Sequence, residues 1–340
     1  GAGFYHTCAL IAGGAMKCWG YNQFGGLGDG SSTTRTAPVA VAGLIGVTAV
    51  SPGSLHTCVL TALGDVKCWG YNFFGQTGNG STSQSAVPAN VAWHTVGVAS
   101  IGVGAYHSCA VTSGGAARCW GANESGQLGD NTTTQRTSAV AVAGLDSGVV
   151  AISTGAVHSC ALTVGGGVWC WGRNSDGQLG NNSLTNSPIP VAVVGLGSGV
   201  AAISAGGYHT CALTTTGAMK CWGLNASGQV GDNSTTTRLT PADVSGLGSG
   251  VSAISGGALH TCALTGGAAK CWGYNTWGTV GDNSTTQRLV PTAVSGLGSG
   301  VAAISAGVLH TCALVAGGVK CWGYNVYGQL GDNSTTQRLT

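Results

Sequence analysis

The chain has 340 residues, of which 43% are hydrophobic and only 6% are charged, and its formal net charge is +2. An ordinary soluble domain carries roughly 25% charged residues, so this chain has no electrostatic means of holding nucleic acid or an anionic membrane surface. The hydrophobic fraction excludes intrinsic disorder, and no apolar run reaches the roughly 20 residues of a membrane helix. We expect neither a nucleic-acid partner nor membrane insertion.

One unit recurs seven times along the chain. The string His-Thr/Ser-Cys returns every 50 or 51 residues, and each copy continues to Cys-Trp-Gly. A period of this length is typical of propeller blades. We expect a single domain over residues 1–340, whose first and last repeats are incomplete. The repeat histidines are His6, His56, His107, His158, His209, His260 and His310.

The unit that begins at Val251 predicts four strands. Residues 251–255 alternate apolar and small polar side chains, as a short strand does, and residues 260–265, 268–272 and 290–294 also have the character of strands. Pro291 is tolerated only on an edge strand, so this strand is the outermost. The sequence therefore predicts an all-β fold, a seven-bladed β-propeller with four-stranded antiparallel blades.

Two cysteines lie on the second and third predicted strands of every unit. Nine or ten residues separate them, which fits a hairpin with a two- or three-residue turn. Counting back from the turn at Gly266-Gly267 places Cys262 opposite Cys271 as a non-hydrogen-bonded pair, close enough for a disulfide. We favour one disulfide per blade over free thiols or a zinc site that includes the histidine. The pairs are Cys8–Cys18, Cys58–Cys68, Cys109–Cys119, Cys160–Cys170, Cys211–Cys221, Cys262–Cys271 and Cys312–Cys321.

The repeat resembles the regulator of chromosome condensation family of seven-bladed propellers. Residues 206–213 (Gly-Gly-Tyr-His-Thr-Cys-Ala-Leu) and 222–231 (Trp-Gly-Leu-Asn-Ala-Ser-Gly-Gln-Val-Gly) follow that family's repeat. The resemblance implies a fold but several functions, because relatives include a nucleotide exchange factor, a plant ultraviolet photoreceptor and secreted bacterial β-lactamase inhibitors. Paired cysteines in every blade, without basic tails or a Gly-Trp-Arg-His-Thr motif, favour a secreted, bacterial-type member.

A residue present in every blade is expected to serve the blade rather than an active site. We expect the repeat histidines to be buried and bonded to turn backbone, and the tryptophans to pack between blades. Asp232 and its equivalents should form Asx turns rather than a calcium site, and the Arg238 series should form a solvated ring. No catalytic triad or nucleotide-binding motif appears. We expect no enzyme activity, no cofactor and no metal.

The loop after Cys-Trp-Gly differs between repeats. Its first and fourth positions are both aromatic in units 1, 2, 6 and 7, and polar, charged or small in units 3, 4 and 5. Closing the propeller makes these four units neighbours, so their aromatics predict one arc of the kind found at interface hot spots. The alternative is that each aromatic packs only its own loop. The candidate binding residues are Tyr21, Phe24, Tyr71, Phe74, Tyr274, Trp277, Tyr324 and Tyr327.

Two predicted strands are absent, the first of unit 1 and the fourth of unit 7, and both gaps fall at the join of the propeller. Either the sequence is trimmed from a longer chain or a neighbouring molecule supplies strands there. Our leading hypothesis is a non-catalytic scaffold, extracellular or at the cell surface, that binds a protein or a glycan through its blade-end loops. The alternatives are a self-assembling subunit of an extracellular filament or surface layer, and a secreted enzyme inhibitor.

Overall fold

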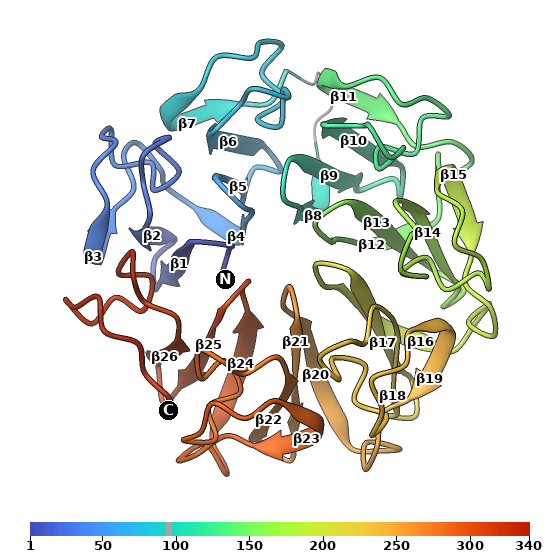
Figure 1. Cartoon of the computed structure of the whole chain (residues 1–340). Coiled ribbons are helices and arrows are strands. Elements are labelled where there is room, and N and C mark those ends of the chain that lie inside the picture. The colour runs from blue at the N-terminus through green and yellow to red at the C-terminus, as the bar shows by residue number, and fades with distance from the viewer. Residues whose placement is uncertain (93–96) are drawn as a thin grey trace.

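The computed structural model describes residues 1–92 and 97–340, which fold into seven antiparallel sheets around a central channel (Figure 1). Each sheet is one blade, numbered in chain order. Five blades have four strands, whereas blade 1 (β1-β2-β3) and blade 7 (β24-β25-β26) have three. The predicted seven-bladed propeller is therefore confirmed. Within the described ranges, no helix is long and apolar enough to cross a membrane.

The strands occupy four positions from the channel outward. The innermost strands are β4 (Val47–Pro52), β8 (Val98–Val103), β12 (Val149–Thr154), β16 (Val200–Ala205), β20 (Val251–Gly256) and β24 (Val301–Ala306). The second strands begin at the repeat histidine and are β1 (His6–Ile11), β5 (His56–Thr61), β9 (His107–Thr112), β13 (His158–Thr163), β17 (His209–Thr214), β21 (His260–Thr265) and β25 (His310–Val315).

The third strands carry Cys-Trp-Gly and the fourth strands form the outer edge. The third strands are β2 (Ala15–Gly20), β6 (Val66–Gly70), β10 (Ala117–Gly121), β14 (Val168–Gly172), β18 (Met219–Gly223), β22 (Ala268–Gly273) and β26 (Gly318–Gly323). The fourth strands are β3 (Arg35–Ala40), β7 (Ser85–Asn90), β11 (Arg136–Ala141), β15 (Ser187–Ala192), β19 (Arg238–Asp243) and β23 (Arg288–Ala293). The outer strand of blade 6 thus begins two residues earlier than predicted, because Arg288 pairs with Gly273 across a bulge.

The hairpin between the second and third strands has the predicted register. Thr265 pairs with Ala268, and Gly266 and Gly267 form the turn with φ of 58° and 77°, the left-handed values that a two-residue hairpin turn needs. Cys262 therefore faces Cys271, with the Cα atoms 4.1 Å apart. All seven predicted pairs are bridged and no cysteine is free.

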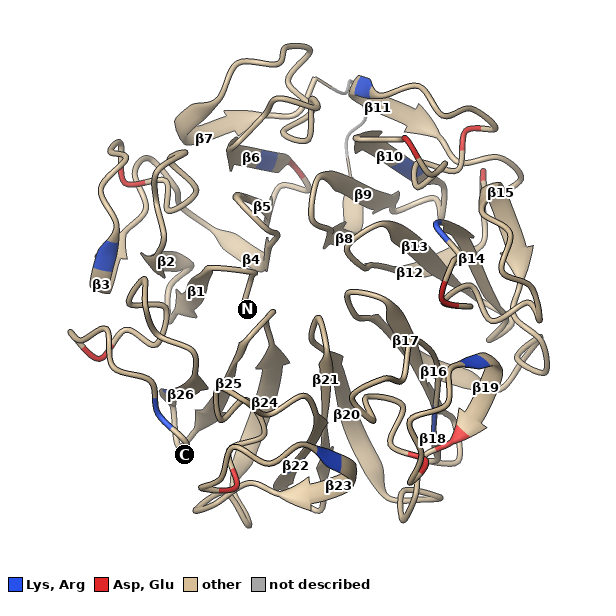
Figure 2. Ribbon diagram, in the orientation of Figure 1, with Lys and Arg blue, Asp and Glu red and all other residues tan. Residues whose placement is uncertain are grey.

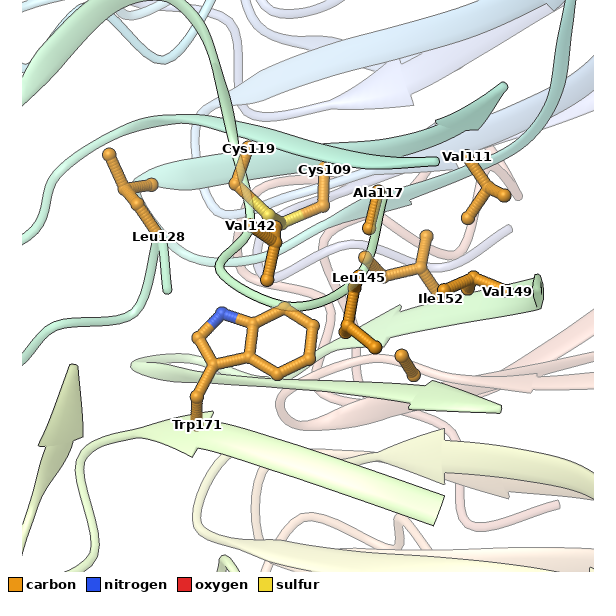
Figure 3. Close-up of a cluster of buried hydrophobic side chains, with 11 residues drawn as sticks. Cys109, Val111, Ala117, Cys119, Leu128, Val142, Leu145, Val149, Ile152 and Trp171 are labelled. Atoms are coloured by element: carbon orange, nitrogen blue, oxygen red, sulfur yellow. A yellow bond between two sulfur atoms is a disulfide. The ribbon is translucent and has the colours of Figure 1, made fainter. Parts of the chain in front are cut away.

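Each blade packs against the next through the repeat tryptophan, as predicted. Between blades 3 and 4, the Cys109–Cys119 disulfide, Leu128 and Val142 cover the indole of Trp171 (Figure 3). The indole Nε1 donates a hydrogen bond of 2.9 Å to the carbonyl of Gln127 in the preceding blade. Burial of a large ring with its one polar atom satisfied stabilises the blade interface without a desolvation penalty.

The repeat histidines are fully buried, but their partners differ from the prediction. Each Nε2 bonds the Thr or Ser hydroxyl of the next blade at 2.7–2.9 Å, rather than turn backbone. His158, for example, bonds Thr210, whose hydroxyl donates in turn to the carbonyl of Gln178. A repeat unit read alone does not show what lies across a blade boundary. We call these seven links the histidine belt; its last link, His310 to Thr7, joins blade 7 to blade 1.

The histidine belt fixes the protonation of its imidazoles. Because each hydroxyl gives its only proton to a carbonyl, it must accept from the histidine, which places the proton on Nε2. The Nδ1 atoms of His56, His107, His158 and their later equivalents have no hydrogen-bond partner among the described residues. Burial lowers the pKa of the repeat histidines to about 3 or 4, so they are neutral at physiological pH.

The few charged side chains lie on the outer parts of the blades (Figure 2). Asp232 Oδ1 accepts from the backbone N–H of Ser234 at 3.1 Å, the expected Asx turn. The arginines are solvated, as expected, with the Arg238 side chain 39% exposed, but they are also paired: Arg238 Nε donates to Asp232 Oδ2 at 2.6 Å. Burial alone would raise the pKa of Asp232, but hydrogen bonds from Ser234, Arg238 and Asn225 lower it. The same aspartate–arginine pair recurs in blades 1, 3, 6 and 7.

Replacing Thr210 by Val should lower the free energy of unfolding by about 1–3 kcal/mol, because it leaves the Nε2–H of His158 buried without a partner and leaves the carbonyl of Gln178 with only the indole N–H of Trp222. The matched control is Thr210→Ser, since Ser108 and Ser159 already fill this position; it should cost less than about 1 kcal/mol. Urea unfolding measures both. If both variants lost the same free energy of unfolding, the hydroxyl group of Thr210 would contribute no more to stability than its methyl group does.

The protein should lose stability as the pH falls from about 7.5 to 5. The unfolded histidines take up protons below their ordinary pKa of 6.5, whereas the folded ones stay neutral down to about 4. Below pH 6.5, each such histidine lowers the free energy of unfolding by about 1.4 kcal/mol for every unit by which the pH falls. The effects of the seven histidines add. Urea unfolding at pH 7.5, 6 and 5 measures the free energy of unfolding. This range lies above the pH at which carboxylates titrate, so the histidines dominate the change. A constant free energy of unfolding across it would contradict the belt.

Candidate functional site

The loops that follow the third strands are held rigid from within. The side chain of Asn225 is fully buried and donates to the carbonyls of Ser234 and Thr236 at 3.1 and 3.0 Å, while its Oδ1 accepts from the N–H of Val230 at 2.9 Å. Both the amide nitrogen and the amide oxygen of Asn225 are thus bonded within the loop, so the loop has little freedom. The same asparagine closes the other six loops, at Asn22, Asn72, Asn123, Asn174, Asn275 and Asn325.

Each loop begins beside the residue that precedes the repeat histidine. The N–H of Tyr21 donates to the carbonyl of Tyr5 at 3.0 Å, and the N–H of Leu224 donates to that of Tyr208 at 2.9 Å. The residue before the histidine and the residue at the first loop position therefore lie side by side, at the same end of the blade as the fourth loop position. This arrangement presents three columns of variable residues around one face of the propeller.

Seven of the eight predicted aromatic residues form a continuous series of ring contacts. Three contacts cross from one blade to the next, each with ring centroids 4.9 Å apart: Trp277–Tyr324, Tyr327–Tyr21 and Phe24–Tyr71. Three more join the two aromatics of one loop, at 6.2–6.4 Å: Tyr21–Phe24, Tyr71–Phe74 and Tyr324–Tyr327. These spacings are those of favourable aromatic pairs. The eighth residue, Tyr274, opens the loop of blade 6 and is not part of this series among the described residues.

The structure adds three residues that the sequence reasoning missed. Tyr5 contacts Tyr21 and Tyr327, with centroids 6.1 and 5.7 Å away. Tyr106 contacts Phe74 at 5.4 Å, and Phe73, whose side chain is 64% exposed, contacts Phe74 at 5.2 Å. Comparing the residues that precede the repeat histidine in each unit would have found Tyr5 and Tyr106. We call the following residues the aromatic arc: Tyr5, Tyr21, Phe24, Tyr71, Phe73, Phe74, Tyr106, Trp277, Tyr324 and Tyr327.

The aromatic arc is uncharged. Burial raises the pKa of Tyr5, Tyr21, Tyr71 and Tyr324, and neighbouring tyrosines raise it further, so their hydroxyls stay protonated. The opposite side of the same face is polar. There Arg173 lies 3.9 Å from Asp176 and above the ring of Tyr208, 5.6 Å from its centroid. One face of the propeller therefore carries an apolar half and a polar half.

The central channel offers little room for a ligand. Its cavity measures about 190 Å³ and is lined mostly by glycine, alanine, serine and valine, together with Phe4, and none of the described lining residues has a titratable side chain. A Cβ on Gly104 would lie 2.5 Å from the carbonyl oxygen of Gly155 and from the imidazole of His107, so this position excludes any side chain. Within residues 1–92 and 97–340 no three His, Cys, Asp or Glu side chains could hold a metal ion.

Comparison with known families matches the whole length of the repeats. Residues 94–340 match the RCC1-like domain family. Residues 1–25 and 47–76, and in an overlapping match residues 14–60 and 64–111, correspond to the regulator of chromosome condensation (RCC1) repeat.

Individual relatives match only in part. Probable E3 ubiquitin-protein ligase HERC4 of Homo sapiens is 35% identical over 170 residues, which are 49% of this chain and 16% of that protein. Ultraviolet-B receptor UVR8 of Arabidopsis thaliana is 31% identical over 270 residues, 77% of this chain and 61% of the receptor. The crystal structure of Kap60 bound to yeast RCC1 (Prp20) matches with a TM-score of 0.85 and 21% identity, covering 99% of this chain and 82% of that one; it shows the fold alone. The chain thus spans less than two thirds of either curated relative.

Proposed function

This chain belongs to the regulator of chromosome condensation (RCC1) repeat family, and we propose that it is a non-catalytic scaffold that binds a protein partner through the aromatic arc. The observation that carries the proposal is the series of ring contacts across blades 6, 7, 1 and 2. Yeast RCC1 (Prp20), of the same fold, has been crystallised with a bound protein, Kap60.

The aromatic arc has the physical character of a protein interface. Tyrosine, tryptophan and phenylalanine are the residues that dominate binding energy at such surfaces, and a polar rim normally surrounds them. Here the asparagine-closed loops fix the backbone beneath the rings, so little conformational entropy is lost on binding. Removing uncharged side chains from water also carries a low desolvation cost. The arc therefore favours binding on a preformed surface.

A binding role fits the chemistry of the titratable groups better than catalysis does. The repeat histidines are buried, neutral and committed to structural hydrogen bonds in every blade. Three of the acids outside the repeat aspartates make surface ion pairs: Arg118–Asp146, Arg173–Asp176 and Lys220–Asp243. A catalytic site needs a unique set of groups in one place, and these groups lie on separate blades.

We place the protein outside the cell or at the cell surface, as a bacterial-type secreted member of its family. The support is the seven disulfides, one in each blade, because such bonds form and persist in oxidising compartments. Secreted enzyme inhibition would be one form of this protein binding.

The proposal is tested by placing a photo-crosslinking residue on each half of the loop face. Val326 and Ala226 occupy the same exposed loop position in blades 7 and 5. Val326 lies between Tyr324 and Tyr327 of the aromatic arc in the sequence, whereas Ala226 lies in the polar half of the face. With extracts of the source organism's surface and medium, capture of a protein at position 326 and not at 226 is expected. Equal capture at both positions contradicts a partner specific to the arc, and capture of polysaccharide alone would replace the protein by a glycan.

The double substitution Trp277→Ser and Tyr327→Ser should abolish that capture while shifting Tm by less than about 4 °C, because the loops are held by Asn275 and Asn325 rather than by the rings. The matched control, Leu224→Ser in blade 5, should leave capture unchanged. Loss of folding in the double variant would instead support the alternative that the aromatics only pack their own loops.

A further inference from the structure

The aromatic arc has a compact group of rings where blade 2 meets blade 3. The loop of blade 2, Tyr71-Asn72-Phe73-Phe74, is the one such loop in the sequence that carries three aromatic residues. With Tyr106 of blade 3 these residues form a cluster in which the ring centroids of contacting pairs lie 5.2–6.5 Å apart. We call Tyr71, Phe73, Phe74 and Tyr106 the four-ring cluster. Both blades contribute to it, so it is a surface built at their junction.

The four-ring cluster presents a ring face to solvent. Phe73 stacks on Tyr71 with an interplanar angle of 18°, and Phe74 lies edge-on to both, at 88° and 70°. Because Tyr71 covers one face of Phe73, the 64% exposure of the Phe73 side chain leaves its other face open. Tyr106, which contacts Tyr71 and Phe74, is 36% exposed. The face of an aromatic ring is its negative side, so the cluster attracts cations.

The chain supplies a carboxylate near the four-ring cluster but no cation. Within the residues that the structure describes, no lysine or arginine lies over these rings. The loop of blade 3 begins at Ala122, whose N–H donates to the carbonyl of Tyr106 at 2.9 Å, and two residues later it carries Glu124. The side chain of Glu124 is exposed and has no ion pair or hydrogen bond with any described residue. The surface therefore has negative charge with nothing to balance it.

The same face of the propeller shows, at blades 4 and 5, how it holds a cation. Tyr208 precedes its repeat histidine as Tyr106 does. The guanidinium of Arg173 lies over the Tyr208 ring, 5.6 Å from its centroid, and 3.9 Å from the carboxylate of Asp176. A guanidinium between a tyrosine ring and a carboxylate is thus compatible with this scaffold. At blades 2 and 3 the loop position of Arg173 is aromatic, so this place is left to a cation from another molecule.

We propose that the four-ring cluster and Glu124 receive an arginine side chain of the protein partner. This inference rests on the proposed function and names the chemistry that the partner presents to the aromatic arc. Arginine fits the surface better than lysine, because its planar guanidinium stacks on an aromatic face while its N–H groups bond a carboxylate. Arginine is also the charged residue enriched at interface hot spots. The guanidinium would lie within about 6 Å of the ring centroids.

Blocked tripeptides test the contact before the partner is identified. Acetyl-Gly-Arg-Gly-amide, added to the intact chain, should shift the NMR signals of the amides of residues 71–74 and 106 in a saturable way. The control peptide has citrulline in place of arginine, which keeps the shape and removes the charge. It should bind at least about fivefold more weakly, because the cation–π contact and the ion pair are both lost. Equal binding of the two peptides, or shifts confined to other parts of the face, overturns the proposal.

Two variants test the residues themselves. Phe73→Leu and Glu124→Gln should each weaken binding of the arginine peptide by about two- to fivefold, the effect of an exposed cation–π contact or ion pair. Both side chains are exposed, so Tm should not change. The matched control Asp65→Asn removes an exposed carboxylate from the turn between β5 and β6, at the other end of blade 2, and should bind as the wild type does. Unchanged binding by Phe73→Leu and Glu124→Gln contradicts the proposal.

Capture at position 326 separates this inference from the binding role itself. The double variant Phe73→Leu and Glu124→Gln should capture less of the partner than the wild type does. Equal capture by both would leave the scaffold role intact and overturn the arginine contact. Binding of the arginine peptide by a chain that captures no protein would support the cation site and contradict the proposed function.

Discussion

The structure depends on one hydrogen-bond relay repeated at every blade boundary: a buried imidazole donates to a hydroxyl, and the hydroxyl donates to a carbonyl of the preceding blade's loop. In the link from His158 through Thr210 to Gln178, three segments from two blades are fixed by two bonds of 2.9 Å. Because the relay needs a neutral imidazole in a fully buried place, it favours the folded state only where histidine is uncharged. The belt also anchors the loop face, since the carbonyls that accept its protons belong to the loops that display the aromatic arc.

Much of the fold follows from the repeat, because a hairpin is local. The register of a hairpin is determined by the spacing of its two cysteines and by the glycines of its turn, as for Cys262 and Cys271. The disulfides could therefore be predicted without knowing how the blades are arranged. What lies across a blade boundary could not. The hydroxyl partner of each histidine belongs to the next blade and is about one repeat away in the chain. Tyr5 and Tyr106 were missed for a different reason: each is brought to the loop face by a backbone hydrogen bond with the first loop position of its own blade, about 16 residues later in the chain.

Function in such a protein is carried by departures from the repeat. The residues common to all blades are buried and are held by disulfides or by indole and imidazole hydrogen bonds; the Nδ1 atoms of six repeat histidines lack a partner among the described residues, but they too are out of reach of a ligand. The aromatic arc is a place where the sevenfold pattern breaks. In the arc, loop side chains vary on a constant backbone. That variation suits recognition of a partner's surface.

Long-range proton–nitrogen NMR correlation of the imidazoles tests the central claim most directly. The belt predicts that all seven repeat histidines are neutral and carry their proton on Nε2, because every hydroxyl partner has given its own proton to a carbonyl. It also predicts that this pattern persists unchanged from about pH 8 to the onset of acid unfolding, since burial lowers the pKa of each histidine to about 3 or 4. Histidines protonated on Nδ1, or titrating in the folded protein near pH 6.5, would contradict it.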